Sequence, residues 1–166
     1  PPRLLNPMIP QELEAICLKG LSKDQDDRQQ SAAELAAGIS GWISDQAERR
    51  RKEQEREQFF SMSLGALATL DGTGRFEQVN PAFVELFGYS KDELKNMTAM
   101  DLIVSDDLVS KDGELFRRVL AGENLTGLVR RARCKDGAIR WIQWHLTKLP
   151  NGDFVFSVGR DITHER

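Results

Sequence analysis

The apolar positions of the chain change their spacing twice. In residues 1–43 they recur every three or four residues, as on one face of a helix. Residues 44–58 are almost entirely charged or Gln. Residues 61–166 mix short alternating runs with short helical patterns, separated by Gly-rich turns. The pattern predicts a helical hairpin at residues 1–43, a charged helical linker at residues 44–60 and an α+β domain at residues 61–166.

Two short helices are predicted within residues 1–43. Pro10 suits the first position of one helix, and Ser31 precedes Glu34 by the three residues of a capping box that would start the other. The apolar side chains of this hairpin need cover. We expect them to pack on a second subunit or on the domain that follows; they are Ile16, Leu21, Leu35, Ile39 and Trp42.

The linker is predicted to be a helical spacer. Its residues are good helix formers of both signs, and Glu48 and Lys52 have the spacing of a favourable ion pair. A parallel dimer stalk is the alternative, but a coiled coil needs several heptads of apolar seam positions. The linker offers few of them, namely Ile43, Ala47, Phe59 and Phe60. We therefore expect a homodimer through the apolar ends of the linker helix and the outer face of the sheet.

The third region begins as a hairpin followed by helices. Runs at residues 66–70 and 76–79 flank the turn Asp71-Gly72-Thr73-Gly74. Asn80-Pro81 then caps a helix that Gly88 ends, and Ser90 with Glu93 has the spacing of a capping box. A longer helix is predicted over residues 106–120.

Three strands are predicted at the end of the chain. Residues 128–134, 139–149 and 154–162 are joined by turns that contain Asp-Gly and Asn-Gly. Hairpin connections make neighbouring strands antiparallel, and the intervening helices must cover one face of the sheet. The predicted fold class is α+β, with a five-stranded antiparallel sheet, helices on one face, and a preceding helical hairpin and linker helix.

Six short motifs follow one another in this third region. They are Asp71-Gly72-Thr73-Gly74-Arg75, Val79-Asn80-Pro81-Ala82-Phe83, Leu86-Phe87-Gly88-Tyr89-Ser90 with Glu93-Leu94, Arg133-Cys134-Lys135-Asp136-Gly137, Trp141-Ile142-Gln143-Trp144, and Val158-Gly159-Arg160-Asp161-Ile162-Thr163. In this order and at this spacing they resemble the PAS family of sensory domains. The resemblance implies a small central cavity under the helices.

The first region resembles a different family. Residues 7–10, 12–19 and 28–35 are similar to the last helices of a bacterial serine/threonine protein kinase. The catalytic motifs of that family are absent from this sequence, so we expect no enzymatic activity from this fragment. The resemblance implies a parent protein that is a serine/threonine kinase with the sensor placed after its catalytic domain. A fortuitous helical hairpin in another signalling enzyme is the alternative.

The candidate ligand pocket is an apolar set expected on the inner surface of the sheet and its helices. These residues are Leu67, Phe83, Leu86, Phe87, Leu102, Phe116, Val119, Ile142, Trp144, Leu146 and Phe156. Simple core packing would also explain all of them. No charged residue stands at an evident inward position. Asp161 and Thr163 match the family's exit motif, where a short polar residue caps the next helix.

No catalytic residue, metal site or cofactor is predicted. The helix expected at residues 106–120 has no His to ligate haem, and Leu94-Lys95-Asn96-Met97-Thr98 lacks the Cys of flavin-binding relatives, so haem and flavin are disfavoured. His145 is predicted to be a half-buried sheet residue and Cys134 a small filler or a partly exposed thiol. The arginines of two adjacent strands are expected to form a solvated charged face; they are Arg130, Arg131, Arg133 and Arg140.

Net charge and composition limit the classes of partner and the cellular location that we expect. A net charge of -3 gives no reason to propose nucleic acid, and no apolar run is long enough to span a membrane. Two Cys residues 117 positions apart favour a reducing, cytoplasmic location. The sequence lacks an initiating Met, so we expect a segment of a longer protein.

Two functions therefore remain open. The first is a sensing and dimerisation module that regulates a protein kinase, by binding a small ligand or a partner and relaying the change through flanking helices. The second is a ligand-free structural dimerisation or docking domain of another signalling enzyme.

Overall fold

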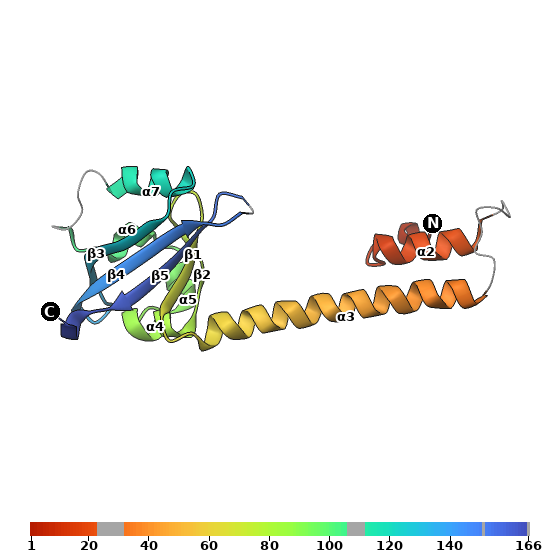
Figure 1. Cartoon of the computed structure of the whole chain (residues 1–166), viewed down its shortest axis with the longest axis horizontal. Coiled ribbons are helices and arrows are strands. Elements are labelled where there is room, and N and C mark those ends of the chain that lie inside the picture. The colour runs from red at the N-terminus through yellow and green to blue at the C-terminus, as the bar shows by residue number, and fades with distance from the viewer. Residues whose placement is uncertain (23–31, 106–111, 151, 166) are drawn as a thin grey trace. The chain divides into compact units, whose positions relative to one another are not determined.

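The computed structural model of the chain describes residues 1–22, 32–105, 112–150 and 152–165 (Figure 1). Contacts divide the chain into two compact units, Pro1–Glu57 and Gln58–Arg166. The N-terminal unit holds α1 (Pro2–Leu5), α2 (Gln11–Gly20) and most of α3 (Ala32–Met62). These helices confirm the predicted N-terminal helical region. The capping box expected at Ser31 falls outside the described residues.

The helices of the N-terminal unit bury little surface. None of the residues described in α1, α2 and α3 is buried, and Leu21 and Ile43 are 74% and 55% exposed. Helices α2 and α3 approach each other at Gly38, where an added Cβ would lie 3.4 Å from Cγ2 of Ile16. The apolar side chains expected to need cover are therefore only partly covered within this unit.

Helix α3 is continuous across the predicted junction between hairpin and linker, at residues 43 and 44. The predicted pair is confirmed, with Nζ of Lys52 2.8 Å from Oε1 of Glu48. Arg51 and Glu55 form a second pair of the same spacing at 3.6 Å. Because all four side chains are more than half exposed, water and salt screen both pairs, and each stabilises the helix only weakly.

The C-terminal unit is built on one five-stranded sheet of strand order β2-β1-β5-β4-β3. Every pairing between neighbouring strands is antiparallel. The strands are β1 (Ala66–Leu70), β2 (Phe76–Val79), β3 (Leu125–Arg133), β4 (Ile139–Lys148) and β5 (Val155–Asp161). This arrangement confirms the predicted fold class and hairpin order.

Short helices gather on one face of this sheet (Figure 1). They are α4 (Pro81–Phe87), α5 (Lys91–Leu94), α6 (Ala99–Leu102) and α7 (Asp112–Leu120). One hydrophobic core joins Phe83 and Phe87 of α4, Leu94 of α5, Leu102 of α6 and Val119 of α7 to the sheet. The helix expected from residue 106 is described from Asp112 onward, and residues 106–111 lie outside the described part.

Local chemistry explains where the hairpin and helices begin. Oδ1 of Asp71 accepts hydrogen bonds from the backbone N–H groups of Thr73 and Arg75, which closes the β1–β2 turn. The predicted capping box of α5 is confirmed, because Ser90 and Glu93 each accept a hydrogen bond from the other's backbone. Gly88, in the left-handed region at φ 77°, ends α4 as predicted.

Small side chains line the inner face of the two central strands. Strand pairing places Ala66 opposite Gly159 and Ala68 opposite Ser157 on that face. The absence of a side chain at Gly159 is required there, because an added Cβ would lie 2.6 Å from Cζ3 of Trp144. Large side chains from β4 and α4 fill the space that these small residues leave.

Candidate functional site

An apolar cavity of about 60 Å³ lies between the inner face of the sheet and helices α6 and α7. Its described lining includes Leu102 and Met100 from α6, and Leu115 and Phe116 from α7. An engineered protein cavity of about 150 Å³ accepts benzene. The cavity in this chain is therefore smaller than a benzene site.

Four of the predicted pocket residues line this cavity: Leu102, Phe116, Trp144 and Leu146. Four others are fully buried in the core beside it and do not line it, namely Phe83, Phe87, Val119 and Ile142. Leu86 is partly buried and packs against that core.

The expected inward position of Leu67 and Phe156 is wrong. Leu67 pairs with Val158, and Phe156 pairs with Thr69. These residues alternate with the inner-face residues of β1 and β5, so their side chains lie on the opposite, outer face. Hydrophobicity alone suggested the inner face, but the small residues of the central strands occupy it.

The cavity also has lining residues that the sequence did not reveal. They are Leu70, Phe76, Ala99, Met100, Ile103, Leu115, Leu125, Leu128 and Ser157. Ser157 could have been found from strand register, because it pairs with Leu146, a residue predicted to face inward. The residues of α6 carry no pattern that distinguishes a cavity from an ordinary core.

Aromatic rings pack around one side of the cavity. The rings of Phe83 and Phe87 are 4.6 Å apart, and those of Phe87 and Trp144 are 6.1 Å apart and nearly parallel. Phe76 meets Phe83 edge to face at 5.3 Å. Trp144 thus belongs both to this cluster and to the cavity lining.

Asn80 connects the start of the domain to its first helix. Its side chain is fully buried, and its Oδ1 accepts hydrogen bonds from the backbone N–H groups of Leu67, at 2.9 Å, and Phe83, at 3.0 Å. Its Nδ2 donates to the carbonyl oxygens of Gly65, at 2.9 Å, and Ser63, at 3.3 Å. One side-chain amide therefore holds three parts of the chain together: the segment that follows α3, strand β1, and the N-terminus of α4.

A second polar cluster, here called the exit network, consists of Arg140, Trp141, Asp161 and Thr163. Oδ1 of Asp161 accepts from the backbone N–H of Thr163 at 2.9 Å, and Oδ2 lies 2.8 Å from a guanidinium nitrogen of Arg140. The backbone N–H of Trp141 donates to Oγ1 of Thr163 at 3.0 Å. The network joins the ends of β4 and β5 to the 3-10 turn η2 (Thr163–Glu165).

The exit network holds Asp161 in its charged form. Burial by itself would raise the pKa of Asp161, but hydrogen bonds from Thr163 and Arg140 outweigh it and lower the pKa. Strand pairing places Asp161 opposite Ile142, and Arg140 opposite Ala132, on the inner face. The expectation that no charged group faces inward is therefore wrong at this end of the sheet.

The four arginines do not form one charged face. Arg130 pairs with Ile142 on the inner face, whereas Arg131 pairs with Trp141 on the outer face. The guanidinium carbon of Arg131 lies 5.8 Å from the centre of the Trp141 ring, as in a cation–π contact. Alternation along β3 divides the arginines between the two faces, which corrects the predicted single patch.

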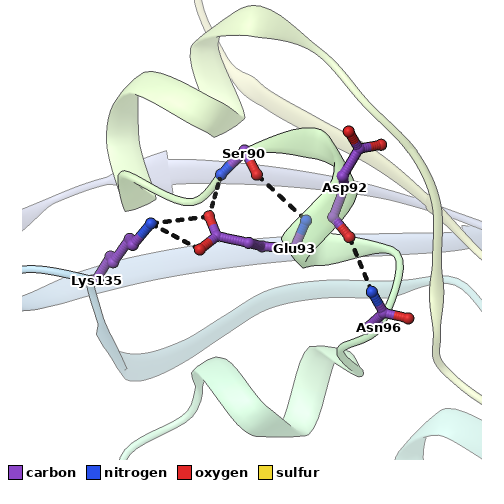
Figure 2. A network of polar contacts seen from close by, with 5 residues as sticks. All are labelled: Ser90, Asp92, Glu93, Asn96 and Lys135. Atoms are coloured by element: carbon purple, nitrogen blue, oxygen red, sulfur yellow. Dashed lines mark hydrogen bonds and ion pairs between the residues drawn. The ribbon is translucent and has the colours of Figure 1, made fainter.

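Helix α5 is tied to the β3–β4 turn by an ion pair (Figure 2). Nζ of Lys135 lies 2.7 and 2.9 Å from the two carboxylate oxygens of Glu93, and one of these oxygens also accepts from the backbone N–H of Ser90. The hydrogen bond from Lys135, followed by those from Ser90, lowers the pKa of Glu93 from 4.5 to about 2. The carboxylate thus serves at once as helix cap and as contact to the sheet.

The comparison with known protein families identifies this region. The profile described as PAS fold matches residues 59–166. The chain belongs to the PAS fold family. No curated protein sequence matches it.

Several solved structures share this architecture at low sequence identity. A domain of a sensory box sensor histidine kinase/response regulator from Geobacter sulfurreducens has 22% identity and a TM-score of 0.60, with 66% of this chain and 94% of that chain covered. The PAS domain of an HTR-like protein from Haloarcula marismortui has 20% identity and a TM-score of 0.60, with 68% and 99% covered. The PAS domain of a Colwellia psychrerythraea protein has 24% identity and a TM-score of 0.56, with 67% and 97% covered. At these identities the likeness shows the fold.

Cys134 and His145 are the remaining residues of the PAS domain for which the sequence predicted an environment. Cys134 is 4% exposed, and its Sγ lies 3.4 Å from the carbonyl oxygen of Leu86, which favours the small filler over the partly exposed thiol that was the other predicted role. Burial raises the pKa of its thiol. His145 is exposed on the outer face, where it pairs with Val158, rather than half-buried as predicted.

The cavity and the described helices also bear on cofactor binding and membrane insertion. A cavity smaller than a benzene site does not fit the ring system of a haem or a flavin. Across the part of the chain that the structure describes, no group of three or more His, Cys, Asp or Glu residues is placed to hold a metal ion. Within that same part, each helix is too short or too polar to cross a bilayer.

Proposed function

We propose that the PAS domain is a signal-input module that senses a small molecule in the inner cavity and relays its binding to the flanking helices. The observation that carries this proposal is the partly open apolar cavity between the sheet and helices α6 and α7. Native cores are close-packed, so a lined void between two layers is unusual and costs stability. A ligand that fills it would stabilise the bound conformation.

The relay is proposed to run along β4 and β5. Trp144 of β4 and Ser157 of β5 line the cavity, while Trp141 and Asp161 of the same strands belong to the exit network. A ligand that binds one arrangement of these strands better than another shifts the population toward it. The hydrogen bonds to Thr163 would carry that shift to whatever follows η2.

The N-terminal side offers a second route for the relay. Nδ2 of Asn80 donates to the carbonyl groups of Ser63 and Gly65, which directly follow α3. Movement of α4 would therefore displace the C-terminal end of α3. This contact supports a sensor that acts on helices at both of its ends.

We further propose that this module regulates a protein kinase in the same protein and acts as a homodimer. The resemblance of residues 1–43 to the last helices of a serine/threonine kinase supports the first part, and a structural neighbour belongs to a sensor histidine kinase. The exposed apolar residues at the two ends of the linker support a second copy as the partner, with Ile43 and Phe59 at 55% and 80% exposure. The coding sequence upstream of Pro1 tests the kinase class: a His-Arg-Asp loop would support serine/threonine chemistry, and a histidine-kinase core would contradict it.

A ligand-free dimerisation or docking domain is the second candidate function. The small volume of the cavity, about 60 Å³, favours it, because a void of this size also occurs as a packing defect. In that case no small molecule would change the stability of the domain.

A thermal-shift screen with a cavity-filled control separates the two candidates. A true ligand at 100 times its Kd should stabilise the full chain by about 2.7 kcal/mol, which raises the melting temperature by several degrees. Ala99→Leu should fill the cavity and abolish that shift, whereas Ala138→Leu in the exposed β3–β4 turn should preserve it. A metabolite panel that shifts neither the chain nor the control would favour the ligand-free alternative.

A further inference from the structure

The cavity contains one small polar group at its floor. Ser157 is 3% exposed, lies at the middle of β5 and lines the cavity. Strand pairing places it between Ala68 and Leu146 on the inner face, so its side chain stands among apolar neighbours. Within the described structure, no side-chain hydrogen bond engages its hydroxyl.

The Ser157 hydroxyl borders an apolar cavity, where the surrounding side chains offer it few hydrogen-bond partners. Transfer of such a group from water without a compensating hydrogen bond is unfavourable, and the large majority of buried polar side chains in proteins are paired. The hydroxyl of Ser157 faces a void, so a molecule inside that void can pair with it. Alanine at this position, as at Ala68 beside it, would fit the same space but would offer no hydrogen bond to a molecule in the cavity.

The rest of the described lining limits what that molecule can be. Beside Ser157, the lining residue with an N–H or O–H group is Trp144, and the others are Leu, Ile, Phe, Ala and Met. An ion would lose its hydration with no opposite charge to replace it. The volume of about 60 Å³ is well below the roughly 150 Å³ of a cavity known to accept benzene, which favours a small molecule.

We propose that the cavity takes a small uncharged molecule with an aliphatic body and one hydroxyl or carbonyl oxygen, and that Ser157 is the residue that recognises this oxygen. The inference rests on the proposed ligand-sensing function and names its ligand class. Ser157 binds the polar end, and the leucines of the lining contact the aliphatic end.

The test compares two probes of nearly equal shape on the full chain. Propan-2-ol carries a hydroxyl, and 2-chloropropane carries chlorine in its place. Binding is followed by NMR through the indole N–H of Trp144, with the indole of Trp42, in the N-terminal unit, as a control for general solvent effects. Ser157→Ala should weaken propan-2-ol binding roughly 2- to 12-fold, the factor expected for one net hydrogen bond, and should leave 2-chloropropane binding unchanged.

The outcomes distinguish this inference from the function on which it rests. If both probes bind the wild-type chain and Ser157→Ala changes their affinities by the same factor, the ligand class is wrong and the sensing cavity stands. If neither probe gives a saturable shift at Trp144, both the ligand class and the sensing function are overturned. Ser157→Cys keeps a side chain of similar size but is a weaker hydrogen-bond donor, so it should lose less affinity for propan-2-ol than Ser157→Ala does. It replaces Ser157→Ala in the test if that variant does not fold.

Discussion

Asn80 holds the entry of the PAS domain together through one side-chain amide. Its Oδ1 serves two buried backbone donors, and its Nδ2 serves two carbonyl groups. Asn80→Ala leaves these groups without partners and removes the cap of α4. We predict a loss of about 2 to 4 kcal/mol in the free energy of unfolding, measured by urea denaturation of the full chain.

Ser90→Ala is the matched control for that substitution. Ser90 also caps a helix, but it is exposed, so its backbone partners can bond to water instead. The expected loss is about 1 kcal/mol. Equal losses for the two variants would contradict the role given to the buried amide of Asn80.

Gly159 is predicted to tolerate no side chain because of Trp144. A Cβ at this position would lie 2.6 Å from Cζ3 and 3.0 Å from Cη2 of the indole. Gly159→Ala should cost about 1 to 3 kcal/mol through overpacking, and Trp144→Leu in the same chain should recover part of it. A double-mutant cycle measures this coupling, and additive losses would show that the ring is not the obstacle.

The role of a single residue could be predicted where neighbours in the sequence determine it. It could not be predicted where the pairing of the whole sheet determines it. Asn80, Gly88 and Ser90 could be assigned from the sequence, since a cap is set by neighbours a few residues away. Leu67 and Phe156 could not, because the face of a residue depends on which strands flank its own. In β1 and β5, Leu67 and Phe156 lie on the outer face, while the small residues Ala68 and Ser157 lie on the inner face.

At the scale of elements, the contact between α5 and the β3–β4 turn depends on pH. The pKa of Glu93 is lowered to about 2 in the folded chain, so its contribution to stability is complete above its ordinary pKa and is lost as the pH falls toward 2. Between about pH 5 and pH 2, the melting temperature of the wild-type chain should therefore fall more steeply than that of Glu93→Gln.

Lys135→Met provides the control for this pH dependence. The hydrogen bond from Lys135 is the largest cause of the low pKa of Glu93. Its removal should make the acid slope shallower, as Glu93→Gln does. Acid slopes identical to that of the wild type in both variants would show that this pair does not link α5 to the sheet.

Elements could be placed from the sequence because turns and caps mark their ends. The Asp-Gly turn at Asp136-Gly137 gave the β3–β4 hairpin, and Gly137 indeed has a positive φ of 86°. Strand β3 starts at Leu125, three residues before its predicted start, because pairing with Leu146 extends it past an irregular register. Such an extension depends on a distant strand and leaves no local signal.

For the whole molecule, we predict a homodimer in solution. The ends of α3 and the segment after it expose apolar side chains, with Met62 and Leu64 at 79% and 100% exposure. Phe59→Glu combined with Met62→Glu should dissociate the dimer, whereas Arg49→Glu in the charged centre should not. Light scattering measures the mass, and a monomeric wild-type chain would contradict the prediction.

At the scale of the whole molecule, the sequence predicted the sheet. It predicted an apolar cavity beneath the helices, but not the size of that cavity or most of its lining residues. Alternation and turn residues are enough to predict the β1–β2 and β3–β4–β5 hairpins, and the pairing of β1 with β5 joins them into one sheet. The void is what remains after Trp144 lies over Gly159 and α6 and α7 have packed. Its size depends on side-chain conformations across several elements, which no stretch of sequence encodes.

The most direct test of the proposed relay is whether filling the cavity changes the chemical environment of the exit network. Xenon binds dry apolar cavities without needing a polar partner, so it probes the void independently of Ser157. Under xenon pressure, ¹⁵N NMR of the full chain should show shifts of the Trp144 indole together with the backbone amides of Trp141 and Thr163. Shifts confined to the cavity lining, with Trp141 and Thr163 unchanged, would contradict the proposed relay.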